Sequence, residues 1–327
     1  ADRGLSPDTR GTPFATVFSL GTSAVGSSSL IGTGLVDPAD PASATPLRLT
    51  AINVLDLPGG AGCENGGDMM GPYDHRLWNV PGSRYACAWD YPAAAIIQQP
   101  QESVDFIGRA TFKISDKHQA YLEFMGSDIT VNKTFEPNQI SSSTSTAATS
   151  LGPTTWYPLN STTQATYDMV YGALADYFGT AGLNYGAPIA YRWRCIACGP
   201  REIETNTKSY RVLAAFEGEL GTWDYNVGLS RASSKSESTL VSGFHYTDDL
   251  KAVLGSGLIN PFLMPGQSQS AAGMAALAAA SAAGTTLYSG ESLMTQIDAT
   301  FSGAVGWDLP GGPVLVATGI DLRREEF

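Results

Sequence analysis

The sequence predicts an all-β chain that forms part of an antiparallel transmembrane β-barrel, with long extracellular loops that contain short helices. Apolar and polar residues alternate with period two in three separate places, and a short turn interrupts each of them. The connections between these three hairpins are very long, and aromatic residues stand beside the short turns. Short turns at one end of the strands and long loops at the other are typical of outer-membrane barrels.

The clearest hairpin covers residues 210–230. Charged residues such as Arg211, Glu217 and Glu219 alternate with apolar or small ones, and Gly221-Thr222 forms a two-residue turn. Period-two patterning on both sides of such a turn predicts that one face of the hairpin is apolar. We expect this face to carry Tyr210, Val212, Ala214, Phe216, Gly218, Leu220, Trp223, Tyr225, Val227 and Leu229.

Two more hairpins repeat this design. In the first, strands with Phe106 and Phe124 on the apolar face flank a polar turn at residues 115–118. In the last, strands with Ile297 and Leu322 on the apolar face flank a turn at residues 308–313. Arg109, Arg211, Glu217 and Glu219 fall on the opposite, polar faces, where they would line a lumen or dock a plug.

We interpret residues 1–327 as part of one β-barrel domain. Its hairpins occupy residues 102–131, 191–240 and 292–327, and its extracellular loops occupy residues 1–101, 132–190 and 241–291. A compact soluble domain rarely tolerates unstructured loops of this length. Residues 163–178 have helical spacing of apolar positions, and residues 248–254 and 271–283 are expected to form further short helices within the loops.

Three aromatic residues occupy equivalent positions in the predicted hairpins, next to a short turn. Trp223, Tyr225 and Trp307 lie on the apolar face beside short turns, where an aromatic girdle would meet the membrane interface. The alternative is that they are ordinary core aromatics. A secreted soluble β-sandwich shows the same alternation and remains an open interpretation.

Composition restricts the class of function. The net charge of −12 excludes nucleic-acid binding, which needs basic patches, and suits a solvated surface or cationic ligands. No run of residues has the length and apolarity of a transmembrane helix, so a membrane location requires a barrel.

Four cysteines occur as two pairs, Cys63 with Cys87 and Cys195 with Cys198. An even number at these spacings predicts two disulfides in an oxidising compartment, although the connectivity is not determined by spacing. A zinc half-site, a redox CxxC motif and free thiols are the alternatives for Cys195 and Cys198.

No catalytic motif is recognisable in the sequence. The chain contains no GxSxG, HExxH, Walker or dinucleotide-binding pattern, so we expect no enzyme activity, no cofactor and no metal site. Glu217 and Glu219 are separated by one residue and could form an acid–base pair, but carboxylates on the lumen side explain them as well.

Several segments resemble one family. The last hairpin, GAVGWDLPGGPVLVATGIDLRREEF, is similar to the strand–DLPGGP–strand–RRE signature of proteobacterial TonB-dependent outer-membrane receptors. The segments QESVDFIGRATFKISDKHQAYLEF, APIAYRWRCIACGPRE, YRVLAAFEGELGTWDYNVGLSRASSKS and GSGLINPF also resemble this family, as does the loop bracketed by Cys63 and Cys87. Together these segments cover most of residues 50–327.

The resemblance implies that the chain is an internal portion of a plugged 22-stranded barrel, without its plug or TonB box. It implies import of a scarce ligand into the periplasm, such as a siderophore, cobalamin or an oligosaccharide. The implied partners are the TonB complex, acting through a plug domain absent from this chain, and membrane lipid or lipopolysaccharide. The implied location is the bacterial outer membrane, with the loops facing outward.

Ligand recognition would then fall to aromatic residues of the loops. We expect contacts from Trp78, Tyr85, Trp89, Trp156 and Tyr157, with loop packing as the alternative explanation for each. A second hypothesis is an outer-membrane scaffold whose large loops dock partner proteins of the envelope.

Overall fold

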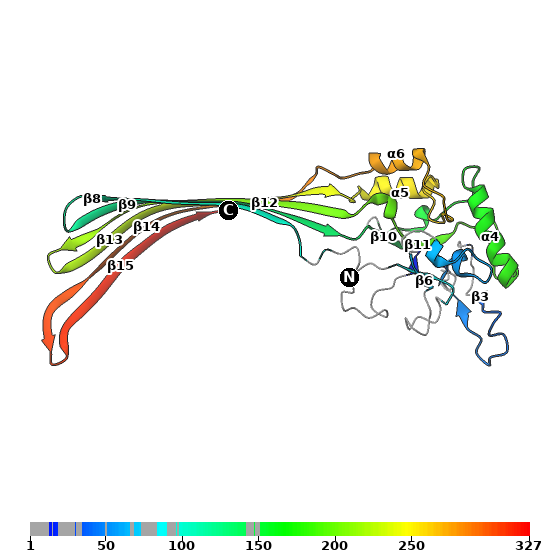
Figure 1. Ribbon diagram of the computed structural model, residues 1–327, viewed down its shortest axis with the longest axis horizontal. Helices are drawn as coiled ribbons and strands as arrows, with labels where there is room; N and C mark the ends of the chain where they lie inside the picture. Colours follow the sequence, from blue (N-terminus) through cyan, green and yellow to red (C-terminus); the bar gives the residue numbers. More distant parts are fainter. Residues whose placement is uncertain are drawn as a thin grey trace. The chain divides into compact units, whose positions relative to one another are not determined.

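The computed structural model describes residues 13–14, 16–18, 30, 35–49, 51–65, 69–72, 84–89, 96, 98–141, 147 and 151–327. These residues are mostly β-strand (Figure 1). The chain divides into two compact units. The first comprises Ala1–Ile97, Thr134–Glu202 and Val241–Ala283, and the second comprises Gln98–Lys133, Ile203–Leu240 and Gly284–Phe327.

The second unit is a six-stranded antiparallel sheet with the order β15-β14-β13-β12-β9-β8. Its strands are long and form three hairpins that are consecutive along the chain, with their turns at one end of the sheet in Figure 1. The strands are β8 (Gln101–Lys113), β9 (His118–Phe135), β12 (Arg201–Leu220), β13 (Trp223–Ser242), β14 (Thr286–Leu309) and β15 (Gly312–Glu326). The three predicted strand pairs are therefore confirmed.

The turns are short, as the sequence predicts. Gly221 has φ of 67°, a left-handed conformation that favours glycine, and it opens the turn between β12 and β13. The last turn is shorter than the six residues expected, because Leu309 still pairs with Gly312 and only residues 310 and 311 remain outside the strands.

The described residues of the first unit form three smaller sheets. The largest has the order β10-β11-β2-β5, and the others are β1-β7-β6 and β3-β4. These strands are β1 (Pro13–Phe14), β2 (Thr16–Phe18), β3 (Leu35–Val36), β4 (Arg48–Leu49), β5 (Ala51–Ile52), β6 (Met69–Pro72), β7 (Cys87–Trp89), β10 (Gln139–Ser141) and β11 (Ala190–Arg194).

Three α-helices in the described part of the chain match the three expected from sequence. They are α4 (Gln164–Phe178), α5 (Thr247–Ser256) and α6 (Ala271–Ala279). Helix α4 ends where Gly179 adopts φ of 75°, and Ser270 caps α6 by accepting a hydrogen bond from the backbone N–H of Gly273. Short 3-10 helices cover Val54–Asp56, Cys63–Asn65, Pro153–Thr155 and Ile196–Cys198.

A hydrophobic core holds the first unit together. The buried face of α4, formed by Tyr167, Val170 and Leu174, belongs to one cluster with Ile52 from β5 and Ile189 beside β11. The segments expected to be long loops thus form a folded unit with its own core. Residues 1–101 were expected to form an irregular loop. This expectation is wrong for the described part of that range, which contributes strands and core residues to the first unit.

Residues 190–194 also differ from expectation. They were predicted to begin the middle hairpin, whereas β11 pairs with β10 and β2 in the first unit. The hairpin itself begins at Arg201, after Pro200, which has no N–H to donate to a strand ladder.

Both predicted disulfides are present, Cys63–Cys87 and Cys195–Cys198. The thiols are therefore bonded, which removes the zinc and free-thiol alternatives for Cys195 and Cys198 in this structure. Cys63 and Cys87 are buried against Leu55, so this disulfide joins its two segments inside a small apolar cluster.

Replacing Cys63 and Cys87 together with serine is expected to lower the free energy of unfolding of the first unit by about 3 kcal/mol, because the disulfide closes a long loop in the unfolded chain. Replacing Cys195 and Cys198 with serine is expected to cost about 2 kcal/mol, because that loop is much shorter. Chemical denaturation of the oxidised proteins measures both. The prediction would be contradicted if the two double variants lost the same free energy of unfolding, or if the Cys195 and Cys198 variant lost more.

The stability of the first unit should also fall at high pH. Burial raises the pKa of Tyr167 to about 12, and its hydroxyl donates to Ala187 O (2.6 Å) and accepts from Gly186 N–H (2.9 Å). Because the unfolded pKa is about 10, this stabilisation is complete below pH ~10 and is lost as the pH rises towards ~12.

Denaturation between pH ~8 and ~11 should therefore show a smaller loss of stability in Tyr167→Phe than in the wild type, although the variant is less stable at neutral pH by about 1–2 kcal/mol. Tyr288→Phe, at an exposed position on β14, is the matched control and should follow the wild type. Identical pH dependence in wild type and Tyr167→Phe would show that the Tyr167 hydroxyl does not contribute.

Candidate functional site

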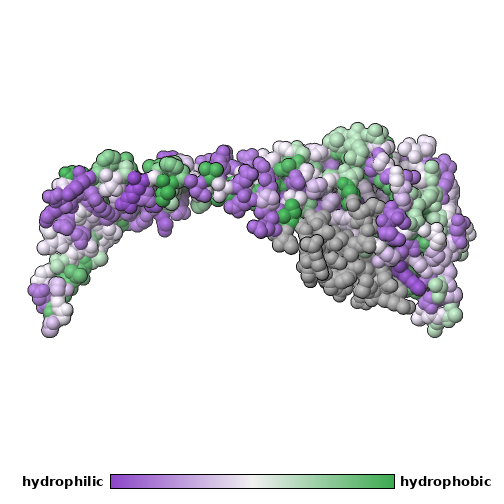
Figure 2. All heavy atoms as spheres, in the orientation of Figure 1, coloured by the Kyte–Doolittle hydropathy of each residue, from purple (hydrophilic) through white to green (hydrophobic). Residues whose placement is uncertain are grey.

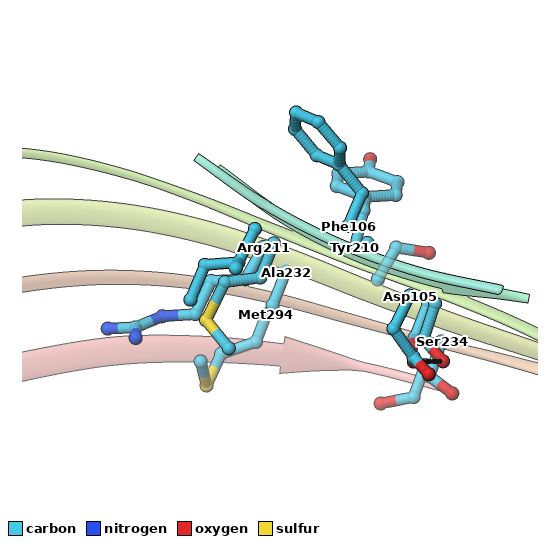
Figure 3. A pocket seen from close by; sticks show the side chains of 14 residues that line it. Asp105, Phe106, Tyr210, Arg211, Ala232, Ser234 and Met294 are labelled. Atoms are coloured by element: carbon cyan, nitrogen blue, oxygen red, sulfur yellow. Dashed lines mark hydrogen bonds between the residues drawn. The ribbon is translucent and has the colours of Figure 1, made fainter. Parts of the chain in front are cut away.

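The six-stranded sheet has two chemically different faces. In Figure 3, Phe106 and Tyr210 project to one side of the strands, whereas Arg211, Ala232 and Met294 project to the other. We call the first side the apolar face and the second the polar face. Register extends this division across the sheet, because cross-strand partners share a face.

Hydrogen bonds connect neighbouring strands on the polar face. Glu217 on β12 accepts from the side-chain amides of Gln119 on β9 and Asn226 on β13, the latter at 3.1 Å. Glu219 lies 3.5 Å from the Lys117 ammonium. The two glutamates thus engage separate partners, which favours a polar lining over an acid–base pair.

Arg109 and Arg211 also lie on the polar face, as predicted. Arg109 stacks over the Tyr121 ring at 4.2 Å and lies 4.0 Å from the Glu123 carboxylate. Arg211 borders a hollow of about 560 Å³, which Ile107 and Met125 also line.

The apolar face is exposed over the whole sheet. Phe216 in the middle of the sheet is 53% exposed, and Ile320 on β15 is 58% exposed. Figure 2 shows hydrophobic residues along the upper margin of these strands, with hydrophilic residues below them. The large exposed side chains of this face are Val104, Phe106, Phe112, Leu122, Phe124, Tyr210, Val212, Phe216, Leu220, Leu229, Ile297, Phe301, Val316, Ile320 and Leu322.

This apolar surface ends sharply along each strand. On β12 the face is apolar or small from residue 210 to residue 220, and Lys208 and Glu204 precede it on the same side. Lys208 lies 3.4 Å from Asp128, which ends the apolar stretch of β9, and Arg324 ends that of β15. We call the area between these charged residues and the short turns the apolar band.

The three predicted girdle residues lie where the apolar band meets the turns. Trp223 begins β13, and Trp307 near the end of β14 is 72% exposed. Tyr225 is half-buried, and its hydroxyl lies 3.1 Å from His118 Nδ1. The positions agree with the expected pattern, and the role at a membrane interface remains a prediction.

Most of the predicted ligand-contacting aromatics are not surface residues. Trp89, Trp156 and Tyr157 are buried, and Trp78 lies outside the described residues. The Arg194 guanidinium stacks over Trp89 at 4.7 Å, and Tyr157 packs edge-on against Phe262 with ring centroids 5.4 Å apart. The burial of these three residues favours the alternative explanation of loop packing over ligand contact.

Tyr85 is half-buried, and its hydroxyl is held in place. It lies 3.1 Å from Asp37 Oδ1 and 2.9 Å from the Tyr177 hydroxyl, and burial raises its pKa. Asp37 is fully buried, and Arg84 forms an ion pair with it at 2.6 Å. Asp37 does not stand out in the sequence, because Arg84 and Tyr85 are nearly 50 residues away from it.

One exposed aromatic group was also missed. Tyr185 is 55% exposed, and its ring packs edge-to-face on Tyr167 and Tyr171 at 5.6 and 5.0 Å. Its hydroxyl donates to Asp168 Oδ1 at 2.8 Å, and this hydrogen bond raises the pKa of Tyr185.

The first unit contains a further hollow of about 380 Å³, lined by Tyr157, Thr162, Asn260 and Gln267 among others. Within the described ranges, no cluster of three or more His, Cys, Asp or Glu side chains is placed to bind a metal ion. None of the helices that the structure describes is long and apolar enough to cross a membrane.

Gly218 provides a test of packing at the turn end of the sheet. A Cβ atom there would overlap the Lys117 carbonyl oxygen and His118, the residue that Tyr225 reaches. Gly218→Ala is therefore expected to lower the free energy of unfolding of the sheet by about 1–3 kcal/mol.

Gly290→Ala is the matched control, since a Cβ atom there meets nothing within 4 Å. It should change stability by no more than about 0.5 kcal/mol. Thermal or chemical denaturation of both variants provides the comparison, and equal stabilities would contradict the close approach at Gly218.

Comparison with known proteins identifies no relative of this chain: no protein-family model, no curated protein and no solved structure matches it. Its function is therefore inferred from the residues and the geometry described above.

Proposed function

We propose that this chain is the barrel portion of a TonB-dependent outer-membrane receptor that imports a scarce ligand into the periplasm. The observation that carries the proposal is the exposed apolar band of the six-stranded sheet. A soluble protein rarely leaves a continuous apolar surface of this size in water. Such a surface is stable when it faces lipid. In this arrangement the polar face of the sheet lines the lumen of the barrel.

The dimensions of the band support this assignment. A tilted strand crosses a bilayer with about 9–11 residues. The apolar stretch of β12 runs from residue 210 to residue 220, and charged residues end it on the side away from the turn. The remaining part of each long strand would extend out of the hydrocarbon region into water.

A membrane location imposes a requirement on the sheet edges. In the described part of the chain, β8 and β15 each pair with one strand only. Unpaired backbone groups cannot face lipid, so barrel closure requires further strands beside β8 and β15. The plug domain and its contact with the TonB complex belong to the same proposal, and they rest on the sequence resemblance alone.

A second candidate is an outer-membrane scaffold that docks other envelope proteins. The size of the first unit favours it, because this folded unit contains more residues than the sheet. The two candidates share the membrane location and differ in the partner. In-cell cross-linking followed by mass spectrometry distinguishes the energy-transducing TonB complex from structural envelope proteins.

The membrane location itself is tested by single cysteines carrying a fluorescent label, in protein reconstituted into liposomes. All four native cysteines are in disulfides, so one introduced cysteine is the only free thiol. Phe216→Cys on the apolar face should be strongly quenched by nitroxide-labelled lipid. Glu217→Cys, its neighbour on the polar face, is the matched control and should be protected.

Lys208→Cys adds a position outside the apolar band and should respond to a water-soluble quencher instead. Equal lipid quenching at positions 216 and 217, or no quenching at either, would contradict a membrane-spanning sheet. In that case the soluble β-protein interpretation would replace both candidates.

A further inference from the structure

The hollow of about 380 Å³ in the first unit has an unusual combination of lining groups. Two segments form it, residues 157–166 and residues 257–270, and none of its described lining residues is charged. Hydroxyl groups, carboxamides, leucines and one tyrosine provide the surface. Its volume falls within the range of about 300–1,000 Å³ that small-molecule sites occupy. We call it the amide groove.

Backbone contacts fix the carboxamides of the groove. Asn260 and Gln269 bond reciprocally, with Asn260 N–H donating to Gln269 Oε1 (2.8 Å) and Gln269 Nε2 donating to Asn260 O (2.7 Å). Asn260 Oδ1 accepts from Phe262 N–H at 2.8 Å, and Gln267 Oε1 accepts from Met264 N–H at 3.0 Å. The oxygen ends of Asn260 and Gln267 are thus occupied by the chain itself.

This arrangement orients the amide hydrogens. Asn260 Nδ2 carries two hydrogens, and one of them bonds Thr166 Oγ1 at 3.2 Å. Gln267 is exposed, and its –NH₂ group lies at the opposite end of the carboxamide from the anchored oxygen. Groups held in this way lose little conformational entropy when they bind a ligand.

Apolar surface lies beside these donors. Leu258, Leu263 and Tyr157 line the same hollow, and Tyr157 is held by its edge-on contact with Phe262. Tyr157 was expected to contact a ligand through an exposed ring, but only part of this buried side chain borders the groove. Gly257, with φ of 76°, lets the two segments of the groove approach closely, since a Cβ atom there would overlap Thr163.

The chemistry of the groove selects a class of ligand. Uncharged carboxamides and hydroxyls pair with hydroxyl groups, and the leucines and tyrosine pack against C–H surfaces. A phosphate or carboxylate would require an arginine or a lysine for tight binding, and the net charge of −12 repels anions. From this chemistry we infer that the amide groove binds a neutral saccharide. The inference deepens the proposed function, since it names the class of imported ligand.

Titration of the purified chain with maltotetraose, cellotetraose and xylotetraose tests the inference, with binding measured by calorimetry and saturation-transfer NMR. Trigalacturonate serves as the charged counterpart. At least one neutral tetrasaccharide is expected to bind more tightly than trigalacturonate. Ser268→Trp, at an exposed lining position, should weaken that binding at least about tenfold by filling the groove.

Two further variants show whether weaker binding in Ser268→Trp results from filling the groove or from misfolding. Thr162→Val removes a lining hydroxyl with little change in shape and should weaken binding roughly three- to tenfold. Ser161→Trp adds the same bulk at an exposed neighbour that does not line the groove, and it should bind like the wild type.

Absence of binding by all three neutral tetrasaccharides, unchanged binding in Ser268→Trp, or equal binding of trigalacturonate would each overturn the inference. Saccharide binding and lipid quenching are separate measurements, so failure of this inference is distinguishable from failure of the proposed function. Lipid quenching at position 216 with no saccharide binding would leave a membrane receptor with a different ligand.

Discussion

The structure of the second unit depends on one constraint, the strict alternation of side chains along paired strands. Backbone pairing holds β12 and β13 side by side over about 20 residues each, and every second side chain must then face the same way. Phe216 and Glu217 are neighbours in sequence but meet opposite surroundings. A slip by one residue would exchange the two faces, so the hydrophobic pattern and the register determine each other.

The first unit is stabilised in a different way. It has a core of ordinary kind, two disulfides and a few buried polar groups with specific partners. Asp37 is completely enclosed, and its interactions with Arg84 and Tyr85 compensate for its lost hydration. Arg194, whose pKa is lowered by burial, donates to Pro137 O and stacks on Trp89.

Local patterns in the sequence predicted much of this fold. Alternation on both sides of Gly221 predicted β12 and β13, and the spacing of Tyr167, Val170 and Leu174 predicted α4. The pairing of β11 with β10 and β2 could not be predicted, because these strands have only three to five residues and meet across long separations. The burial of Trp156 was missed for a related reason. Thr154 and Thr155 precede it, and no alternating or helical pattern in this segment predicts a buried position.

The first unit is assembled from three stretches of chain that the strands of the sheet separate. Its core joins Ile52, Val170 and Leu254, one residue from each stretch. This core cannot be completed before residues 241–283 have been synthesised, by which time both earlier hairpins have left the ribosome. The unit therefore folds late, through contacts between residues far apart in sequence, and such non-local contacts make folding slow. Until then its apolar residues are exposed, and a holding chaperone would find binding sites in this unit as well as in the strands.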